Sequence, residues 1–112
     1  MKSISKMTLG TVQLGMDYGI NNTTGKPDMK ASHEILRTAL HNSITSLDTA
    51  NAYGDSEIVI GSYLKQSKET PFITTKFLTT SPAGTNEDMI EKEIYGCVEN
   101  SLKRLNVKKL DC

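Results

Sequence analysis

The sequence predicts an α/β fold in which parallel strands alternate with helices. Short apolar runs bounded by Gly, Pro or Asn alternate with longer segments whose apolar residues recur at helical spacing. The expected strands cover residues 7–14, 44–47 and 72–77, with a fourth starting at 109, and the expected helices cover residues 31–40, 56–65 and 85–105. Because a helix separates each strand from the next, we expect right-handed crossovers between parallel strands.

The first strand is expected over residues 7–14, where Leu9 and Leu14 are apolar. Gly10 lies inside this run, and a glycine within a strand suggests that another group approaches the backbone closely. The segment that follows, from residue 15 to residue 30, is rich in Gly, Asn, Thr and Asp. A loop of this length is usually functional or disordered, so two readings stay open: it helps to bind a substrate or cofactor, or it is a mobile connection.

The next two helices have recognisable ends. Asn42 follows the helix at 31–40, and Asn is common where a helix stops in a left-handed conformation. Asp55 or Ser56 can cap the following helix. Gly61 inside that helix costs about 1 kcal/mol relative to Ala, and its expected benefit is close packing on the sheet.

The longest expected helix begins near Asn86 and ends near residue 105. Its acidic first turn and basic last turn match the helix dipole. Its apolar face is expected to point inward, with Cys97 as a core thiol. The residues of that face are Ile90, Ile94, Cys97 or Val98, Ser101 or Leu102, and Leu105.

Two architectures begin with this order of elements: an open doubly wound sheet and a closed (β/α)8 barrel. An open nucleotide-binding sheet needs a glycine-rich phosphate turn, but Gly10, Gly15 and Gly19 do not form G-x-G-x-x-G. A phosphate loop is also absent, since Gly25 and Lys26 precede a proline rather than Ser or Thr. A barrel takes about 250 residues. The 112 residues are therefore expected to form one partial barrel domain of about three βα units and the start of strand 4.

The composition of the chain argues against several classes of binding partner. Thirteen basic and thirteen acidic residues cancel, which gives no electrostatic footprint for nucleic acid or an anionic membrane. The sequence shows no signal peptide and no apolar run of membrane-spanning length. Two cysteines without a pattern predict neither a disulfide scaffold nor a metal site, and they favour a reduced, cytoplasmic location.

Three polar residues follow the expected second and third strands. Asp48 and Tyr53 come after the second strand, and Lys76 lies at the end of the third. The carboxyl ends of parallel barrel strands meet at one face, where the catalytic residues of such barrels lie. A carboxylate, a phenol and an amine at this face can form a proton-donating site, in which an ammonium favours the ionised phenol.

The residues around these three positions resemble the aldo-keto reductase superfamily. The resemblance is carried by Leu47-Asp48-Thr49-Ala50-Asn51-Ala52-Tyr53-Gly54 with Ser56-Glu57 and Gly61, by Thr75-Lys76, by Ser101-Leu102-Lys103-Arg104-Leu105 with Leu110-Asp111, and by Leu9-Gly10-Thr11-Val12-Gln13-Leu14-Gly15. These pieces run through the whole chain in order. The resemblance implies a (β/α)8 barrel that reduces aldehydes or ketones with NADPH, with NADH left open.

The resemblance also implies roles for single residues. Of the family's Asp, Tyr, Lys and His tetrad, the first three map to Asp48, Tyr53 and Lys76. The His would fall a few residues after Asp111, so residues 1–112 are expected to be truncated before it and to be inactive alone. The cofactor-binding residues implied are Gly10, Thr11 and Asp48.

Two other functions stay open. Lys76 could be the Schiff-base nucleophile of an aldolase, or the chain could be a non-catalytic, regulatory relative. In addition, three βα units leave open strand edges, and such edges pair with other chains. The 112-residue chain is therefore expected to self-associate.

Overall fold

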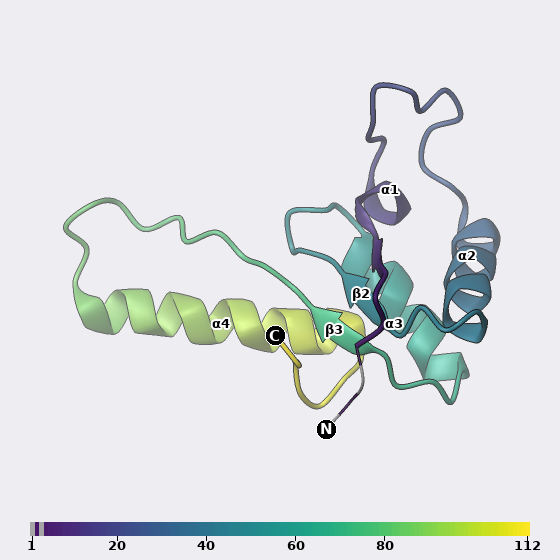
Figure 1. Cartoon of the computed structure of the whole chain (residues 1–112). Coiled ribbons are helices and arrows are strands. Elements are labelled where there is room, and N and C mark those ends of the chain that lie inside the picture. The colour runs from purple at the N-terminus through teal and green to yellow at the C-terminus, as the bar shows by residue number, and fades with distance from the viewer. Residues whose placement is uncertain (1, 3) are drawn as a thin grey trace.

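A computed structural model describes residue 2 and residues 4–112, and it contains a three-stranded parallel sheet in the order β1-β2-β3. Helices connect the strands, as Figure 1 shows. The elements in chain order are β1 (Thr8–Gly10), α1 (Val12–Gly15), α2 (Met29–His41), β2 (Ser46–Asp48), α3 (Ser56–Gln66), β3 (Phe72–Thr74) and α4 (Glu87–Leu105). The predicted alternation of strands and helices is confirmed.

The register of the sheet aligns two sets of three residues, one residue from each strand, into rows that run across the sheet. They consist of Leu9, Leu47 and Ile73 in the middle and of Gly10, Asp48 and Thr74 at the carboxyl end. Successive residues of a strand point to opposite faces, so these two rows face opposite ways. The first row joins the hydrophobic core, which leaves the Asp48 row for the other face of the sheet.

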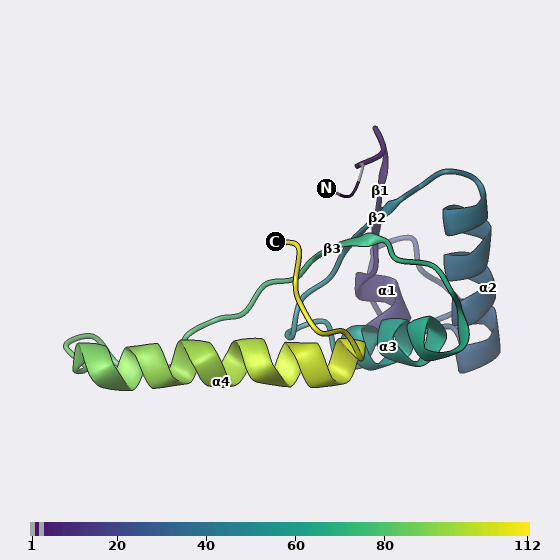
Figure 2. The ribbon, with the colours of Figure 1, turned by 90° about the horizontal axis from the view of Figure 1, so that it is seen from below.

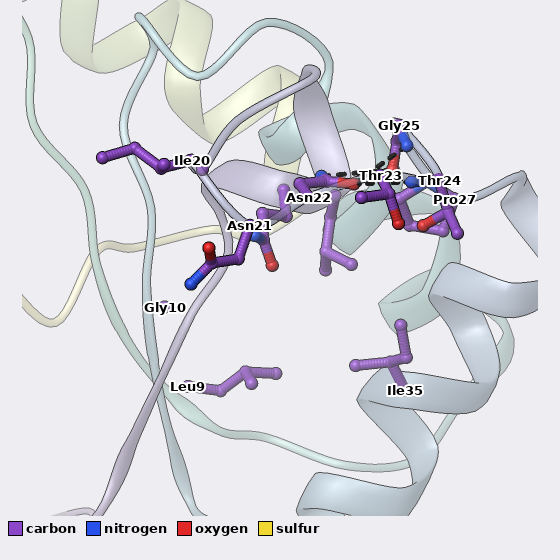
Figure 3. Close-up of a pocket in the computed structure, with 13 residues that line it drawn as sticks. Leu9, Gly10, Ile20, Asn21, Asn22, Thr23, Thr24, Gly25, Pro27 and Ile35 are labelled. Carbon is purple, nitrogen blue, oxygen red and sulfur yellow. Dashed lines mark hydrogen bonds between the residues drawn. The ribbon is translucent and has the colours of Figure 1, made fainter.

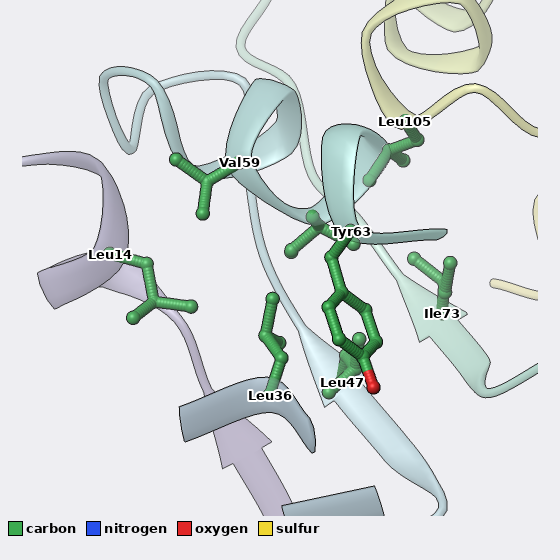
Figure 4. Packing of buried hydrophobic residues seen from close by; sticks show 8 residues of the cluster. Leu14, Leu36, Leu47, Val59, Tyr63, Ile73 and Leu105 are labelled. Carbon is green, nitrogen blue, oxygen red and sulfur yellow. The ribbon is translucent and has the colours of Figure 1, made fainter. Parts of the chain in front are cut away.

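The core lies between the sheet and helices α2 and α3 (Figure 4). Leu36, Leu47 and Ile60 are completely buried, and Leu105 closes the cluster from the end of α4. The buried members of the cluster are Leu14, Leu36, Leu47, Val59, Ile60, Tyr63, Ile73 and Leu105. Burial of one such side chain stabilises the fold by about 1.5–3 kcal/mol.

The first strand is shorter than expected. It ends at Gly10: the amide of Thr11 makes the last ladder bond, to the carbonyl of Asp48, and the amide of Leu14 then donates to the carbonyl of Thr11 as the chain turns into the short helix α1. The close approach expected at Gly10 occurs instead at Gly15, where a Cβ atom would overlap the carbonyl of Tyr53. Apart from Gly10 and its two chain neighbours, no atom of the described residues lies within 4 Å of the position of a Cβ on Gly10.

Two expected helix ends differ in detail. Asn42 has a φ of −97°, and the left-handed conformation falls one residue later, at Ser43 with a φ of 67°. The side chain of Asp55 does not cap α3; its carboxylate pairs with Lys26 at 2.7 Å. In contrast, the Asn86 side chain accepts from an amide in the first turn of α4, as an N-cap should.

Helix α4 packs against the rest of the fold at its C-terminal end, and its first turns extend away from the sheet (Figures 1 and 2). Ser101 and Leu105 are its only buried residues. Ile94 is 37% exposed and Cys97 is half-buried, so the expectation of a continuous inward face and a core thiol was wrong for most of the helix. No helix in the described residues has the length and apolarity to cross a membrane.

Residues 109–112 lie along the outer edge of β3, where the fourth strand was expected to start. The Thr75 amide donates to the Cys112 carbonyl at 3.0 Å, and the Ile73 amide donates to the Asp111 carboxylate at 3.0 Å. Because a side chain takes one of the acceptor positions, the segment follows β3 without forming a regular strand.

Candidate active site at the carboxyl edge of the sheet

The three predicted site residues come together at the carboxyl edge of the sheet. Asp48 is the last residue of β2, Tyr53 lies in the turn before α3, and Lys76 follows β3 by two residues. Backbone pairing continues beyond the strands, because the Asn51 amide donates to the Lys76 carbonyl at 2.9 Å. The two segments that carry the site are therefore fixed to each other.

Asp48 and Lys76 form an ion pair with 2.6 Å between Oδ1 and Nζ. Partial burial acts to lower the pKa of Lys76, but the hydrogen bond and charge of Asp48, with a smaller effect of Tyr53, outweigh it and raise the pKa. The Lys76 Nζ also lies 5.2 Å from the centre of the Tyr53 ring. The ammonium is thus kept charged beside the phenol.

Thr11 supports Asp48 from the neighbouring strand. Thr11 is completely buried, and its amide and hydroxyl both donate to the carbonyl of Asp48, at 3.0 and 2.9 Å. Its own carbonyl accepts from the Ser56 hydroxyl. Its polar groups are therefore occupied by protein partners, so any effect of Thr11 on a cofactor would be indirect, through the position of Asp48.

A cluster of buried hydroxyl groups lies beneath the site, and sequence reasoning missed it. The Ser56 hydroxyl contacts the hydroxyl groups of Thr11 and Thr49 at 2.8 and 2.9 Å. All three residues are completely buried. They join the ends of β1 and β2 to the start of α3. The available signal was a small hydroxyl residue after each strand and at the start of the helix, which is too common to be specific.

The turn that carries Tyr53 is held against the start of the long loop by two glycines. Gly54 has a φ of 54°, which favours glycine, and a Cβ there would overlap the carbonyl of Gly15. The Asp55 amide donates to the same carbonyl at 3.1 Å. Because backbone meets backbone here, the path of the Tyr53 turn is closely defined.

The loop between α1 and α2 borders an open pocket of about 640 Å³ next to β1 (Figure 3). Gly10 lines this pocket, whereas Asp48, Tyr53 and Lys76 do not. The loop is held by side chains: Asn22 Oδ1 accepts from the Gly25 amide at 2.9 Å. Such bonds favour an ordered loop over a mobile connection.

The two histidines lie on α2, away from the predicted site residues. His33 contacts the Ser62 hydroxyl at 2.6 Å, and His41 lies 3.0 Å from Glu69. Both line an open groove between α2 and residues 66–69. Neither is therefore placed to complete a tetrad with Asp48, Tyr53 and Lys76. The described residues contain no group of three potential metal-binding side chains.

The fold and the site together define an α/β protein with reactive residues at the carboxyl ends of parallel strands, as in (β/α)8 barrels. Residues 6–112 match the aldo/keto reductase family, and the chain belongs to that family. The structure corresponds to the N-terminal part of the family's barrels. Members act on carbonyl substrates and typically use NAD(P)H.

Individual relatives support this assignment. The aldo-keto reductase YhdN of Bacillus subtilis is 34% identical over 115 residues, covering 96% of this chain and 32% of its own length. A Pseudomonas aeruginosa protein assigned to the aldo-keto reductases superimposes with a TM-score of 0.75 and 31% identity, over 96% of this chain and 40% of that chain. A glycerol dehydrogenase from Gluconobacter oxydans gives a TM-score of 0.70 at 25% identity, with coverage of 96% and 34%. The chain thus spans about a third of the curated relative's length.

Proposed function

We propose that this chain supplies the proton-donating part of an NADPH-dependent reductase of aldehydes or ketones. The observation that carries the proposal is the Asp48–Lys76–Tyr53 arrangement, with 2.6 Å between the ion-paired atoms and 5.2 Å from the ammonium to the phenol ring. Tyr53 would donate its proton to the carbonyl oxygen. The Lys76 ammonium would stabilise the negative charge left on the phenol oxygen, and Asp48 would hold Lys76 in place.

The residues present fit a bound nicotinamide cofactor, which would supply the hydride for the carbonyl carbon. Gly10 lies in register with Asp48, and apart from its chain neighbours no atom of the described residues lies within 4 Å of the position that a Cβ would take there. Gly10 and Asp48 would bound the cofactor's reactive end, while Thr11 would keep Asp48 in position. NADPH rather than NADH is part of the proposal and depends on residues that contact the rest of the cofactor.

The Schiff-base alternative is disfavoured by the state of Lys76. A nucleophilic lysine must be neutral, so it needs a lowered pKa. Here the pKa of Lys76 is raised, because the effect of Asp48 outweighs that of burial. Borohydride trapping with a carbonyl compound should therefore give no adduct on Lys76.

The non-catalytic alternative has one observation in its favour. Neither His33 nor His41 lies at the site, so the described residues supply three members of the implied tetrad and no histidine beside them. We propose that residues 1–112 do not turn over substrate by themselves. NADPH fluorescence titration of this chain, followed by assay with a panel of aldehydes, tests this; turnover by the chain alone would contradict it.

The direct test of the proposed function is Tyr53→Phe in a protein that contains this chain and reduces aldehydes with NADPH. Loss of a general acid should lower kcat by about 10²–10⁴-fold, with a smaller effect on the Kd of NADPH. Tyr95→Phe is the matched control, because Tyr95 is 63% exposed on α4. Retention of wild-type kcat in Tyr53→Phe would rule out Tyr53 as the proton donor.

A further inference from the structure

We propose that Glu57 and Arg104 form a brace that positions Tyr53 and Lys76 relative to each other. The inference rests on the proposed function, because it concerns the same site. Neither residue is placed against the reacting groups, so both are positioning residues. The brace is defined as the Glu57–Arg104 ion pair together with its contacts to Thr75 and Gly54.

Glu57 fixes the segment that carries Lys76. It lies in the first turn of α3 and is completely buried. Its Oε1 accepts from the hydroxyl of Thr75 at 2.6 Å, and Thr75 directly precedes Lys76. A buried carboxylate that accepts this hydrogen bond limits the movement of the chain immediately before Lys76.

Arg104 fixes the turn that carries Tyr53. Its Nε lies 3.2 Å from Glu57 Oε2, and its terminal amino group donates to the carbonyl of Gly54 at 2.5 Å. Gly54 directly follows Tyr53. Within the described residues Glu57 Oε2 and Arg104 Nε are both buried and have no hydrogen-bond partner, so the ion pair between them is the contact that compensates their burial.

Gly61 makes the brace possible. It follows Glu57 by one helical turn and lies on the same face of α3. A Cβ at Gly61 would overlap the carbonyl of Arg104, so only glycine lets the end of α4 come this close. The expected close packing of Gly61 therefore exists, but its partner is α4 rather than the sheet.

The position of the brace indicates that it does more than pack α3 against α4. A buried ion pair is often no more stabilising than apolar residues of the same size, so its presence alone does not explain its position. Here one end contacts the residue before Lys76 and the other contacts the residue after Tyr53. The brace thus ties together the two segments whose separation sets the distance between ammonium and phenol.

The test uses nuclear magnetic resonance on the 112-residue chain and needs no turnover. Glu57→Gln, Arg104→Lys and Thr75→Val should each weaken the cross-peak between the Tyr53 ring and the Lys76 ε-methylene, and should bring the Lys76 pKa back toward its ordinary value. Thr75→Ser keeps the hydroxyl and should retain both signals. Gly61→Ala changes no charge and should lose both the cross-peak and the raised pKa of Lys76, because it displaces Arg104.

The matched controls are Glu34→Gln and Arg37→Lys, which alter an exposed ion pair on α2 in the same way. These controls should leave both Tyr53–Lys76 signals unchanged. Folded brace variants with an unchanged cross-peak and an unchanged Lys76 titration would overturn the proposal. Unfolding of all the brace variants would also overturn it, since the pair would then serve folding rather than positioning. A chain that shows these shifts while its parent protein reduces no carbonyl would contradict the proposed function and leave the brace intact.

Discussion

The sheet with α2 and α3 and the first turns of α4 show opposite kinds of packing in one chain. Leu36, Leu47 and Ile60 are completely buried, whereas Met89 and Tyr95 on α4 are 62% and 63% exposed. Both regions carry apolar residues at the spacing of their secondary structure. The difference is that α3 packs against α1, α2 and α4 and shares the core cluster with the sheet, while beside the first turns of α4 lies the loop that precedes them (Figure 2).

This contrast teaches that periodicity shows which face of a helix is apolar and does not show what covers it. Helix α4 forms because of its own local signals, including the Asn86 cap, the acidic first turn and the basic last turn. Its burial depends on partners elsewhere. In the described chain those partners bury only Ser101 and Leu105.

The largest expected effect is a difference in stability between a substitution in the core and one on α4. Leu47→Ala should lower the free energy of unfolding by about 2–5 kcal/mol, because it leaves a cavity at a completely buried position. Ile94→Ala should lower it by less than about 1 kcal/mol, because Ile94 is 37% exposed. Denaturant unfolding followed by circular dichroism measures both. Equal losses would show that the first turns of α4 are packed in solution.

A smaller effect is expected from two tyrosine hydroxyl groups. The Tyr63 hydroxyl donates to Glu69 at 2.6 Å, and burial followed by this hydrogen bond raises the pKa of Tyr63 to about 12. Tyr63→Phe should lower the free energy of unfolding by about 1 kcal/mol, and Tyr95→Phe on α4 should leave it unchanged. The same denaturation experiment checks both, and spectrophotometric titration checks the pKa. A Tyr63 midpoint near 10 would contradict the buried hydrogen bond.

The smallest expected effect is a local change with pH at α4. Glu93 accepts hydrogen bonds from the Ser81 hydroxyl and from the amide and hydroxyl of Thr80, which lower its pKa from 4.5 to about 2. A lowered pKa means that the contact stabilises the folded chain above about pH 4.5 and is lost as the pH falls toward about 2. Hydrogen exchange of the Thr80 amide, followed across this pH range, measures the loss of the contact. In Glu93→Gln, the protection of the Thr80 amide against exchange should not change with pH in this range. A midpoint near 4.5 in the wild type would refute the hydrogen bonds between Glu93 and residues 80 and 81.

The order of elements and the gathering of Asp48, Tyr53 and Lys76 could be predicted from the sequence. Both follow from local patterns, since parallel strands that alternate with helices bring their carboxyl ends to one edge. The strand boundaries were less predictable. Val12 and Leu14 suit a strand, but the Leu14 amide donates to the Thr11 carbonyl, a local bond that replaces strand pairing and starts α1.

The supports of the site could not be predicted, because they join residues far apart in the chain. Glu57 and Arg104 are separated by most of two helices and a strand, and neither position alone signals an ion pair. Gly61 gave a signal of close packing, but its partner followed only from the fold. Contacts of this kind depend on how helices sit against each other, and one sequence does not encode that in a readable pattern.

The contact between Gly15 and Gly54 has a consequence for protein engineering. Side chains are excluded at both positions, since either Cβ would overlap backbone of the other segment. The contact between the Tyr53 turn and the start of the loop is thus made mainly by main chain, and Arg104 adds a side-chain hydrogen bond to the Gly54 carbonyl. The loop between α1 and α2 is therefore a segment whose sequence could be randomised to change ligand preference with little effect on the phenol, provided that Gly15 is kept together with Lys26, which pairs with Asp55 directly after Gly54.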